Sequence, residues 1–111
     1  MKYLSKKTVI EGITFDSKKE GLHYLELKRK QELKKISDLE LQPSFLLQER
    51  FKKDGKTYRP ITYIADFKYV EDGKTIVEDV KSDFTAKDKV YKIKKKLLLY
   101  KYNDFEFREV K

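Results

Sequence analysis

The sequence predicts an α/β fold in which a central mixed sheet is flanked by two helices and preceded by a short N-terminal β-ribbon. Two segments, 17–36 and 85–101, are rich in helix-forming residues, and each opens with Ser or Thr followed three residues later by an acid, as capping boxes do. Between them, β-rich segments are joined at two Asp-Gly pairs, which favour two-residue hairpin turns. A last β-rich segment, 105–110, follows the second helix and returns the chain to the sheet.

Length and composition indicate one folded domain over residues 1–111. The chain is 39% hydrophobic and 14% aromatic, which is enough for one core and too apolar for a disordered basic tail. It has no cysteine, so disulfides, a thiol nucleophile and zinc-finger chemistry are excluded. No apolar run approaches the roughly 18 residues that a membrane span needs, and we find no secretory signal. We therefore expect no membrane partner and a cytoplasmic location.

The strands are expected in a simple order along the chain. Residues 8–15 alternate apolar and polar around Glu11-Gly12, which predicts the N-terminal ribbon. Segments 45–51, 58–70 and 75–81 then form three strands of a meander, with turns at Asp54-Gly55 and Asp72-Gly73.

Each predicted helix carries an apolar stripe that we expect to face the core. In the first helix the stripe consists of Leu22, Leu25, Leu33 and Ile36. A second line on the same helix contains Glu20, Tyr24 and Leu27. In the second helix the stripe consists of Val90, Ile93, Leu97 and Tyr100.

The Asp72-Gly73 hairpin places two acids opposite each other. With a two-residue turn the numbers of opposed residues sum to 145, so Asp66 faces Asp79. Like charges at such a cross-strand position are destabilising unless a cation lies between them. A three-residue loop would shift the pairing; Asp66 would then cap a strand end, and the acids of the next strand would form a solvated edge.

Lys81 lies two residues beyond Asp79 and therefore on the same face, whereas Glu78 faces the other way. Carboxylate oxygens without Cys or a nearby His suit Mg²⁺, for which Mn²⁺ often substitutes. A bound metal lowers the pKa of a water nucleophile, and an adjacent lysine can orient that water and stabilise a phosphoryl transition state. The array therefore predicts phosphodiester hydrolysis. The lone His23 is expected at the surface, without an acid partner.

Asp66 followed in the next strand by Asp79-Val80-Lys81 resembles the signature of the PD-(D/E)XK nuclease superfamily, and the order αβββαβ resembles its restriction-endonuclease-like core. Four blocks, in the same order, resemble a group of small phage and prophage proteins of that superfamily described only as a domain of unknown function. The blocks are Phe15-Asp16-Ser17-Lys18-Lys19-Glu20, Leu41-Gln42-Pro43, Tyr63-Ile64-Ala65-Asp66-Phe67 and Val77-Glu78-Asp79-Val80-Lys81. The chain departs from the signature where Ile64-Ala65 replaces the Pro before Asp66, and Glu78 offers an alternative acid beside Asp79.

The resemblance implies roles for further residues. It implies that Glu20 assists the site from the first helix, although the same residue fits a capping role for Ser17. It implies that the backbone carbonyl of Val80 completes the metal shell, and that Tyr91 and Lys94 lie near the scissile phosphate. The alternative for the second helix is that its lysines only solvate it.

The charge distribution predicts a nucleic-acid partner. The net charge is +8, and residues 81–101 contain eight lysines against two aspartates, a local excess of 8 − 2 = +6. We expect Lys87, Lys94 and Lys95 to contact the phosphate backbone, alongside Tyr91. No helix-turn-helix or aromatic RNA-binding signature indicates reading of base sequence.

These observations predict a Mg²⁺-dependent endonuclease that acts on branched or duplex DNA in phage recombination or replication, similar to Holliday junction resolving enzymes. Asp66 and Asp79 would bind the metal, Lys81 would act on water and phosphate, and Glu20 would assist. A homodimer fits symmetric junction cutting, and a phage-encoded protein would work in the bacterial host cytoplasm. The alternatives are a non-catalytic DNA-binding accessory protein with the same fold, and an RNA-directed nuclease or a nicking repair enzyme.

Overall fold

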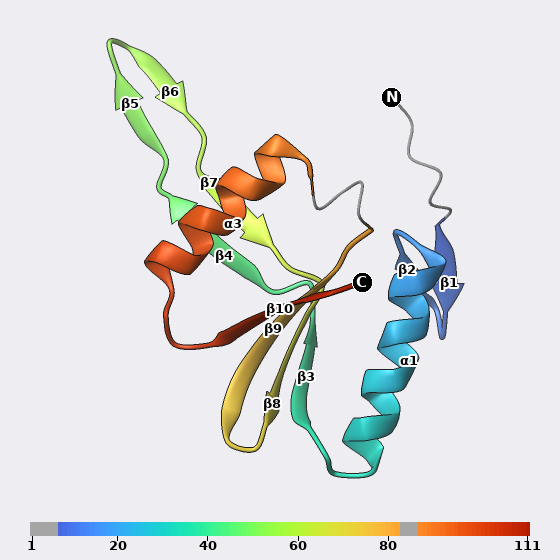
Figure 1. Cartoon of the computed structure of the whole chain (residues 1–111). Helices are drawn as coiled ribbons and strands as arrows, with labels where there is room; N and C mark the ends of the chain where they lie inside the picture. The colour runs from blue at the N-terminus through green and yellow to red at the C-terminus, as the bar shows by residue number, and fades with distance from the viewer. Residues whose placement is uncertain (1–6, 83–86) are drawn as a thin grey trace.

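The computed structural model describes residues 7–82 and 87–111, and its central feature is a four-stranded mixed sheet (Figure 1). The strands of this sheet lie in the order β10-β9-β8-β3, where β10 is parallel to β9 and the other pairs are antiparallel. The prediction of an α/β fold with a mixed sheet and two helices is confirmed. The elements are β1 Thr8–Ile10, β2 Ile13–Phe15, α1 Lys18–Glu32, β3 Ser37–Leu41, β4 Ser44–Gln48, β5 Phe51–Lys53, β6 Lys56–Tyr58, β7 Ile61–Ile64, β8 Phe67–Glu71, β9 Lys74–Val80, α3 Lys89–Lys101 and β10 Glu106–Val110.

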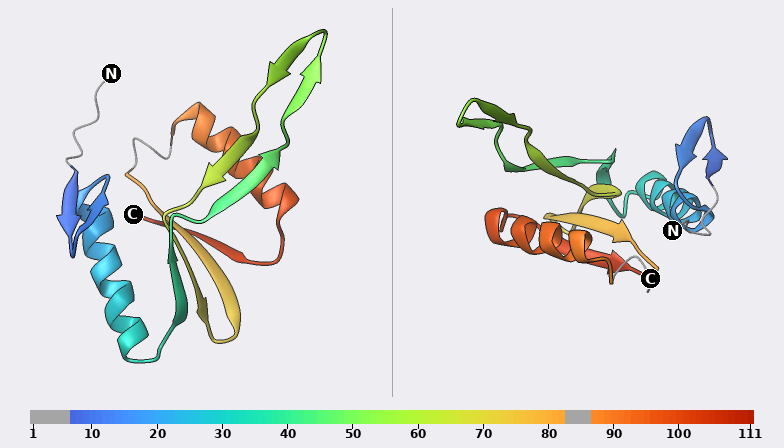
Figure 2. Two further views of the ribbon diagram at one scale, coloured as in Figure 1. Left: turned by 180° about the vertical axis from the view of Figure 1, so that it is seen from behind. Right: turned by 90° about the horizontal axis from the view of Figure 1, so that it is seen from above.

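The two helices lie on either side of the central sheet (Figures 1 and 2). Strand β9 serves both cores because successive side chains point to opposite faces. Its Ile76 packs in the cluster that contains Leu27 of α1, and its Val77 packs in the cluster that contains Leu98 of α3. Asp79 therefore lies on the same face of β9 as Val77, toward α3, whereas Glu78 lies on the same face as Ile76, toward α1.

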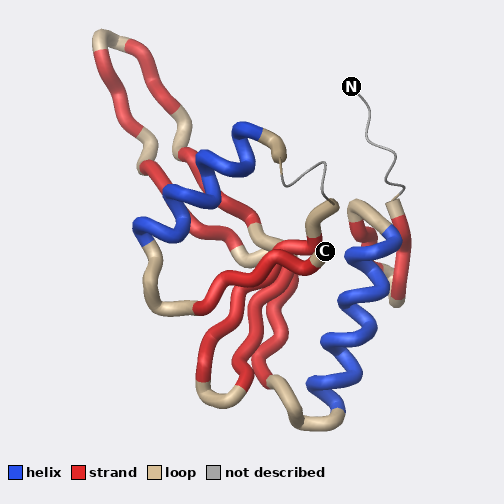
Figure 3. The backbone as a smooth tube through the Cα atoms, in the orientation of Figure 1, coloured by secondary structure: helices blue, strands red, loops and turns tan. Residues whose placement is uncertain are grey.

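The expected three-stranded meander is wrong. Segment 58–70 is interrupted at Pro60 and again at Asp66, so it belongs to three strands, β6, β7 and β8. Proline has no N–H for a ladder hydrogen bond, which explains the first interruption. Strand β7 pairs with β4 in a separate two-stranded sheet, and β5 pairs with β6 in another (Figure 3). Strand β3, which we did not predict, occupies the edge of the central sheet instead.

The expected core stripes of both helices are also wrong. In α1 the side chains of Leu22, Leu25 and Leu33 are exposed, and the second line, Glu20, Tyr24 and Leu27, is the buried one. The helix ends at Glu32, so Ile36 reaches the core from the loop before β3.

In α3, Val90, Ile93, Leu97 and Tyr100 point outward, and Leu98 is the helix residue that is buried. Asp88 caps this helix by accepting hydrogen bonds from the amides of Val90 and Tyr91. The predicted capping residue Thr85 lies outside the described residues.

The hairpin predictions are confirmed. The N-terminal ribbon forms as β1 and β2. Both residues of each Asp-Gly pair have positive φ: 52° at Asp54 and 74° at Gly55, and 52° at Asp72 and 75° at Gly73. These angles are those of a type I′ turn. Lys74 pairs with Glu71, so the β8–β9 hairpin has a two-residue loop.

Candidate active site

The hairpin register brings Asp66 and Asp79 together. Phe67, the first residue of β8, pairs with Glu78, in the register in which the numbers of opposed residues sum to 145. Asp66 precedes Phe67 and Asp79 follows Glu78, so the two aspartates come next to each other. The Asp66 amide donates to Asp79 Oδ1 at 2.9 Å, and the Val80 amide donates to Asp66 Oδ2 at 2.8 Å. Each aspartate is therefore fixed by the backbone of the strand that carries the other.

Both carboxylates lie where ionisation is unfavourable. Burial and the charge of Asp79 raise the pKa of Asp66 to about 6, although the Val80 amide and Lys81 oppose this. Asp79 is 1% exposed, and burial raises its pKa despite hydrogen bonds from the Tyr63 hydroxyl and the Asp66 amide. The pair is thus a concentration of negative charge that these hydrogen bonds only partly stabilise.

Glu20 adds a third acid from the first turn of α1. Its amide donates to Ser17 Oγ at 3.1 Å, which is the capping contact predicted for this position. Glu20 is 6% exposed, and burial together with the charges of Asp66 and Asp16 raises the pKa of its carboxyl group to about 7. The capping contact joins the Glu20 amide to the Ser17 side chain, so the Glu20 carboxyl group takes no part in it. The carboxyl group interacts instead with the charges of the two aspartates, which raise its pKa.

Lys81 supplies positive charge beside this cluster. Its charge lowers the pKa values of Asp66 and Asp79, and its Nζ lies 4.6 Å from the centroid of the Tyr91 ring. Its backbone amide donates to the Val110 carbonyl of β10 at 2.8 Å, which fixes this part of the chain after β9 ends. The predicted proximity of Lys81 to both aspartates is therefore present.

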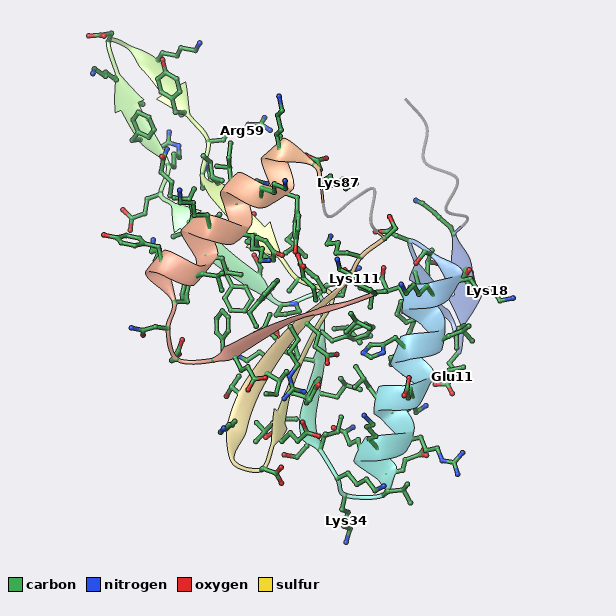
Figure 4. The ribbon with its side chains drawn as sticks, viewed as in Figure 1. Glu11, Lys18, Lys34, Arg59, Lys87 and Lys111 are labelled. Carbon is green, nitrogen blue, oxygen red and sulfur yellow. The ribbon has the colours of Figure 1, made fainter. Side chains whose placement is uncertain are left out.

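A cavity of about 340 Å³ opens next to Asp79 between β7 and the first turns of α3. Lys81, Tyr91 and Lys94 line it, so these three predicted residues are brought to the same place as Asp79. Lys95 points elsewhere: its Nζ lies 3.1 Å from Glu109 Oε2 and 5.5 Å from the centroid of the Phe107 ring. Lys87 is exposed before α3 begins (Figure 4).

Sequence reasoning missed two residues of this site. Tyr63 of β7 donates its hydroxyl hydrogen bond to Asp79, and burial raises the pKa of Tyr63. Glu109 of β10 pairs with Asp79 across the parallel strands and accepts from the Tyr91 hydroxyl. The apolar pattern of the Tyr63 strand could have indicated an inward hydroxyl. No local signal fixes the β9–β10 register, because no turn joins these strands.

Glu78 and His23 form a separate pair on the α1 side of the sheet. His23 Nε2 lies 2.7 Å from Glu78 Oε1, and the Tyr69 hydroxyl donates to Glu78 Oε2 at 2.6 Å. The expectation of a surface histidine without an acid partner is wrong, since the His23 side chain is 14% exposed and is hydrogen-bonded to Glu78. The preference for Asp79 over Glu78 on strand parity agrees with these positions.

The oxygen donors of the site are few. Among residues 7–82 and 87–111, no three His, Cys, Asp or Glu side chains are grouped so that they could hold a metal ion together. Asp66 and Asp79 form a pair, and the charges of both raise the pKa of Glu20. The contact that the structure gives for Val80 is through its amide.

Fold and site together define a small α/β protein with a buried and a partly buried carboxylate side by side and a lysine next to them at one end of a mixed sheet. The chain belongs to the DUF1064 family, described as a protein of unknown function, whose profile matches residues 1–111. Neither a curated protein nor a solved structure matches the chain. No helix in the described part of the chain is long and apolar enough to cross a membrane.

Proposed function

We propose that this protein is a Mg²⁺-dependent DNA endonuclease of the PD-(D/E)XK type, with Asp66, Asp79 and Lys81 as its catalytic residues. The observation that carries the proposal is the mutual backbone anchoring of Asp66 and Asp79. Two strands hold these carboxylates side by side at a cost in electrostatic energy, with a lysine next to them. A purely structural pair of residues at this position would not need two acids.

The donor chemistry fits a hard divalent ion. Mg²⁺ is usually bound through one or two carboxylates and retains several waters, so the Asp66–Asp79 pair is sufficient and a third acid is not required. The raised pKa values of Asp66 and Asp79 reflect burial without a bound cation, and a cation at the pair would favour their ionised forms. When bound, such an ion neutralises charge on a phosphoryl oxygen and lowers the pKa of water.

The remaining roles belong to side chains of the chain. Lys81 is placed to hold the attacking water or a non-bridging phosphate oxygen, because its charge acts on both aspartates. In hydrolysis the water oxygen bonds to phosphorus and gives up a proton, the bond to one bridging oxygen breaks, and the departing oxygen takes up a proton. Glu20, with its pKa raised to about 7, can exchange a proton near neutral pH.

The cavity beside Asp79 supports the choice of a phosphodiester substrate. Its lining places Lys81 and Lys94 together with Asp79 and Asp88, so a phosphate bound there could be met by two ammonium groups beside the carboxylate proposed to bind the metal. The basic lysines of α3 extend this positive surface, which favours a polyanionic backbone over a small anion. We propose branched or duplex DNA as substrate, with a cytoplasmic location and a homodimer as further predictions.

Cleavage assays on labelled DNA test the proposal. A four-way junction, a flap, a duplex and a single strand would be incubated with the protein in Mg²⁺ or Mn²⁺. Wild type is expected to cut at least one of them, with the preferred structure read from the same gel, and Asp79→Asn is expected to cut none. Asp72→Asn is the matched control, because it makes the same change in the turn of the same hairpin at a residue whose positive φ asparagine tolerates.

The accessory-protein alternative gives a different result in this assay. In that case wild type and Asp79→Asn would bind the same DNA and neither would cut it. Cutting retained in Asp79→Asn, with Asp72→Asn equal to wild type, would reject the assignment of the site. Cutting of RNA but not DNA would keep the chemistry and change the substrate.

A further inference from the structure

Residues 48–61 form an arm that projects from the body of the protein (Figures 1 and 3). Every residue of this arm is exposed, and its strands β5 and β6 form a sheet with no other strand. An isolated two-stranded ribbon is marginally stable in water and buries no core. The arm therefore contributes little to the stability of the fold, and its composition reflects another requirement.

The arm is strongly basic. It contains five basic residues against Glu49 and Asp54, an excess of 5 − 2 = +3 within fourteen residues. Within the described part of the chain, no ion pair involves any of the five. They are Arg50, Lys52, Lys53, Lys56 and Arg59.

One face of the arm combines two aromatic rings with two lysines. Phe51 pairs with Tyr58, and their rings stack with centroids 4.7 Å apart and planes 8° apart. Lys53 pairs with Lys56 next to the turn, on the same face by strand parity. Lys56 Nζ lies 5.3 Å from the centroid of the Tyr58 ring, so its ammonium group is held on the aromatic face. Two like charges on opposed residues repel each other, so an anion bound there would be stabilising.

The arm also connects directly to the candidate site. Strand β7 leads from its base to Asp66, which is eleven residues beyond Gly55 at the tip. At about 3.3 Å per residue the tip can lie at most about 36 Å from Asp66, a span close to one turn of B-DNA. A two-stranded ribbon has the width that the major groove of B-DNA admits.

We propose that the arm is a duplex-DNA-binding element that enters a groove up to about one helical turn from the carboxylate pair, with Lys53 and Lys56 on the phosphates. This inference relies on the proposed function for the identity of the partner, and it does not depend on the cleavage chemistry. The stacked Phe51–Tyr58 pair lies between the body of the protein and the two lysines, which are next to the turn at the tip.

Binding of fluorescein-labelled duplexes tests the arm. The double variant Lys53→Gln and Lys56→Gln would be compared with Lys34→Gln and Lys35→Gln, a matched exposed pair at the opposite end of the molecule, where Figure 4 labels Lys34. For a duplex of about 20 base pairs, the arm variant is expected to bind roughly tenfold or more weakly at low salt. Its salt slope should fall by about 1.8, at about 0.9 per lost phosphate contact, and the control pair should match wild type.

Duplex length gives a second readout. On a duplex of about 10 base pairs, roughly one turn, the arm and the site cannot both be engaged fully, so wild type and arm variant should differ much less. Equal affinity of the arm variant and wild type for the longer duplex would overturn the proposal. So would an arm variant that binds single-stranded DNA more weakly than wild type but binds the duplex equally well. Both variants change exposed residues, and unchanged thermal unfolding would verify that they fold.

These results separate the arm from the nuclease proposal. An arm variant that binds as wild type while wild type cuts DNA rejects the arm and retains the enzyme. A weakened arm variant in a protein that cuts nothing retains the arm and rejects the enzyme.

Discussion

His23 Nε2 lies 2.7 Å from Glu78 Oε1, on the opposite side of strand β9 from Asp79. Two adjacent acids of one strand thus have different partners: Glu78 is held by an imidazole and the Tyr69 hydroxyl, whereas Asp79 faces the Asp66 carboxylate. Burial tends to raise the pKa of Glu78, but the hydrogen bonds from His23 and Tyr69 outweigh it and the net pKa is lowered. The first of these acids is held by hydrogen-bond donors of the core, and the second is the one to which the proposed function assigns metal binding.

Replacement of these two acids should separate stability from activity. Glu78→Gln is expected to lower the free energy of unfolding by about 1 to 3 kcal/mol, because it weakens hydrogen bonds to a buried charge. At a temperature where it is folded, it should still cut DNA, whereas Asp79→Asn should not. Denaturant unfolding and a cleavage assay on the same samples check both expectations. Loss of cutting in a well-folded Glu78→Gln would instead make Glu78 the acid of the site.

The Glu20 carboxyl group predicts a stability that falls with pH. Its pKa is raised from 4.5 to about 7, so between these values the folded protein retains a proton that the unfolded chain has lost. Stability therefore decreases as the pH rises through this window. Without metal, Glu20→Gln should be more stable than wild type at pH 8, by at most about 3 kcal/mol, and should show no gain at pH 4.

Thermal unfolding in EDTA at a series of pH values measures this effect, and Glu32→Gln, an exposed change on the same helix, serves as control. Addition of Mg²⁺ should raise the melting temperature of wild type at pH 8, because a cation offsets the repulsion among the acids. A Glu20→Gln protein that is less stable than wild type at pH 8 would contradict the electrostatic account of this residue.

Lys94 and Lys95 should behave differently although they are adjacent. Lys94 lines the cavity beside Asp79, so Lys94→Ala is expected to weaken DNA binding and to reduce the salt slope by about 0.9. Lys95 is paired with Glu109, so Lys95→Ala should lower stability, by about 1 kcal/mol or less, and change the slope little. Fluorescence anisotropy over a salt series distinguishes them, and the reverse pattern would place the DNA on the other side of α3.

The Tyr63 hydroxyl should tune the affinity of the site for metal. Tyr63→Phe removes a hydrogen bond that lowers the pKa of Asp79, so the carboxylate becomes harder to ionise. Loss of such an outer contact typically reduces metal affinity by about 10- to 100-fold. Isothermal titration with Mn²⁺ checks this, with Tyr102→Phe as the matched control because its hydroxyl donates to the Leu46 carbonyl instead. Equal Mn²⁺ affinity in all three proteins would remove Tyr63 from the site.

The parts of the structure that the sequence predicted are those that local chemistry determines. The Asp72-Gly73 turn sets the register that brings Asp66 to Asp79, because Asp and Gly tolerate the positive φ of a type I′ turn. Ser17 likewise caps its helix through a neighbouring amide, as predicted, whereas the second helix is capped by Asp88 and not by the predicted Thr85.

The parts that were not predicted depend on packing between distant segments. Leu22 and Leu25 form a regular stripe, yet α1 buries the line of Tyr24 and Leu27 because the β1–β2 ribbon also packs on this helix. Gly21 permits that approach, since a Cβ there would lie 2.7 Å from Ile10 Cδ1. Periodicity alone could not choose between the two faces of the helix, and it could not place Glu109 beside Asp79.

The hydrogen bond from the Lys81 amide to the Val110 carbonyl has a consequence for the folding order. Asp66 and Asp79 are thirteen residues apart and meet through one hairpin, which forms on a timescale of about 1 to 10 μs in isolated hairpins. Lys81 is fixed only when residues 106–110 have crossed by α3 to lie parallel to β9, and such non-local pairing is slow. We expect the two acids to meet before Lys81 is positioned. The arrangement of two acids and a lysine is therefore completed only when β10 pairs with β9.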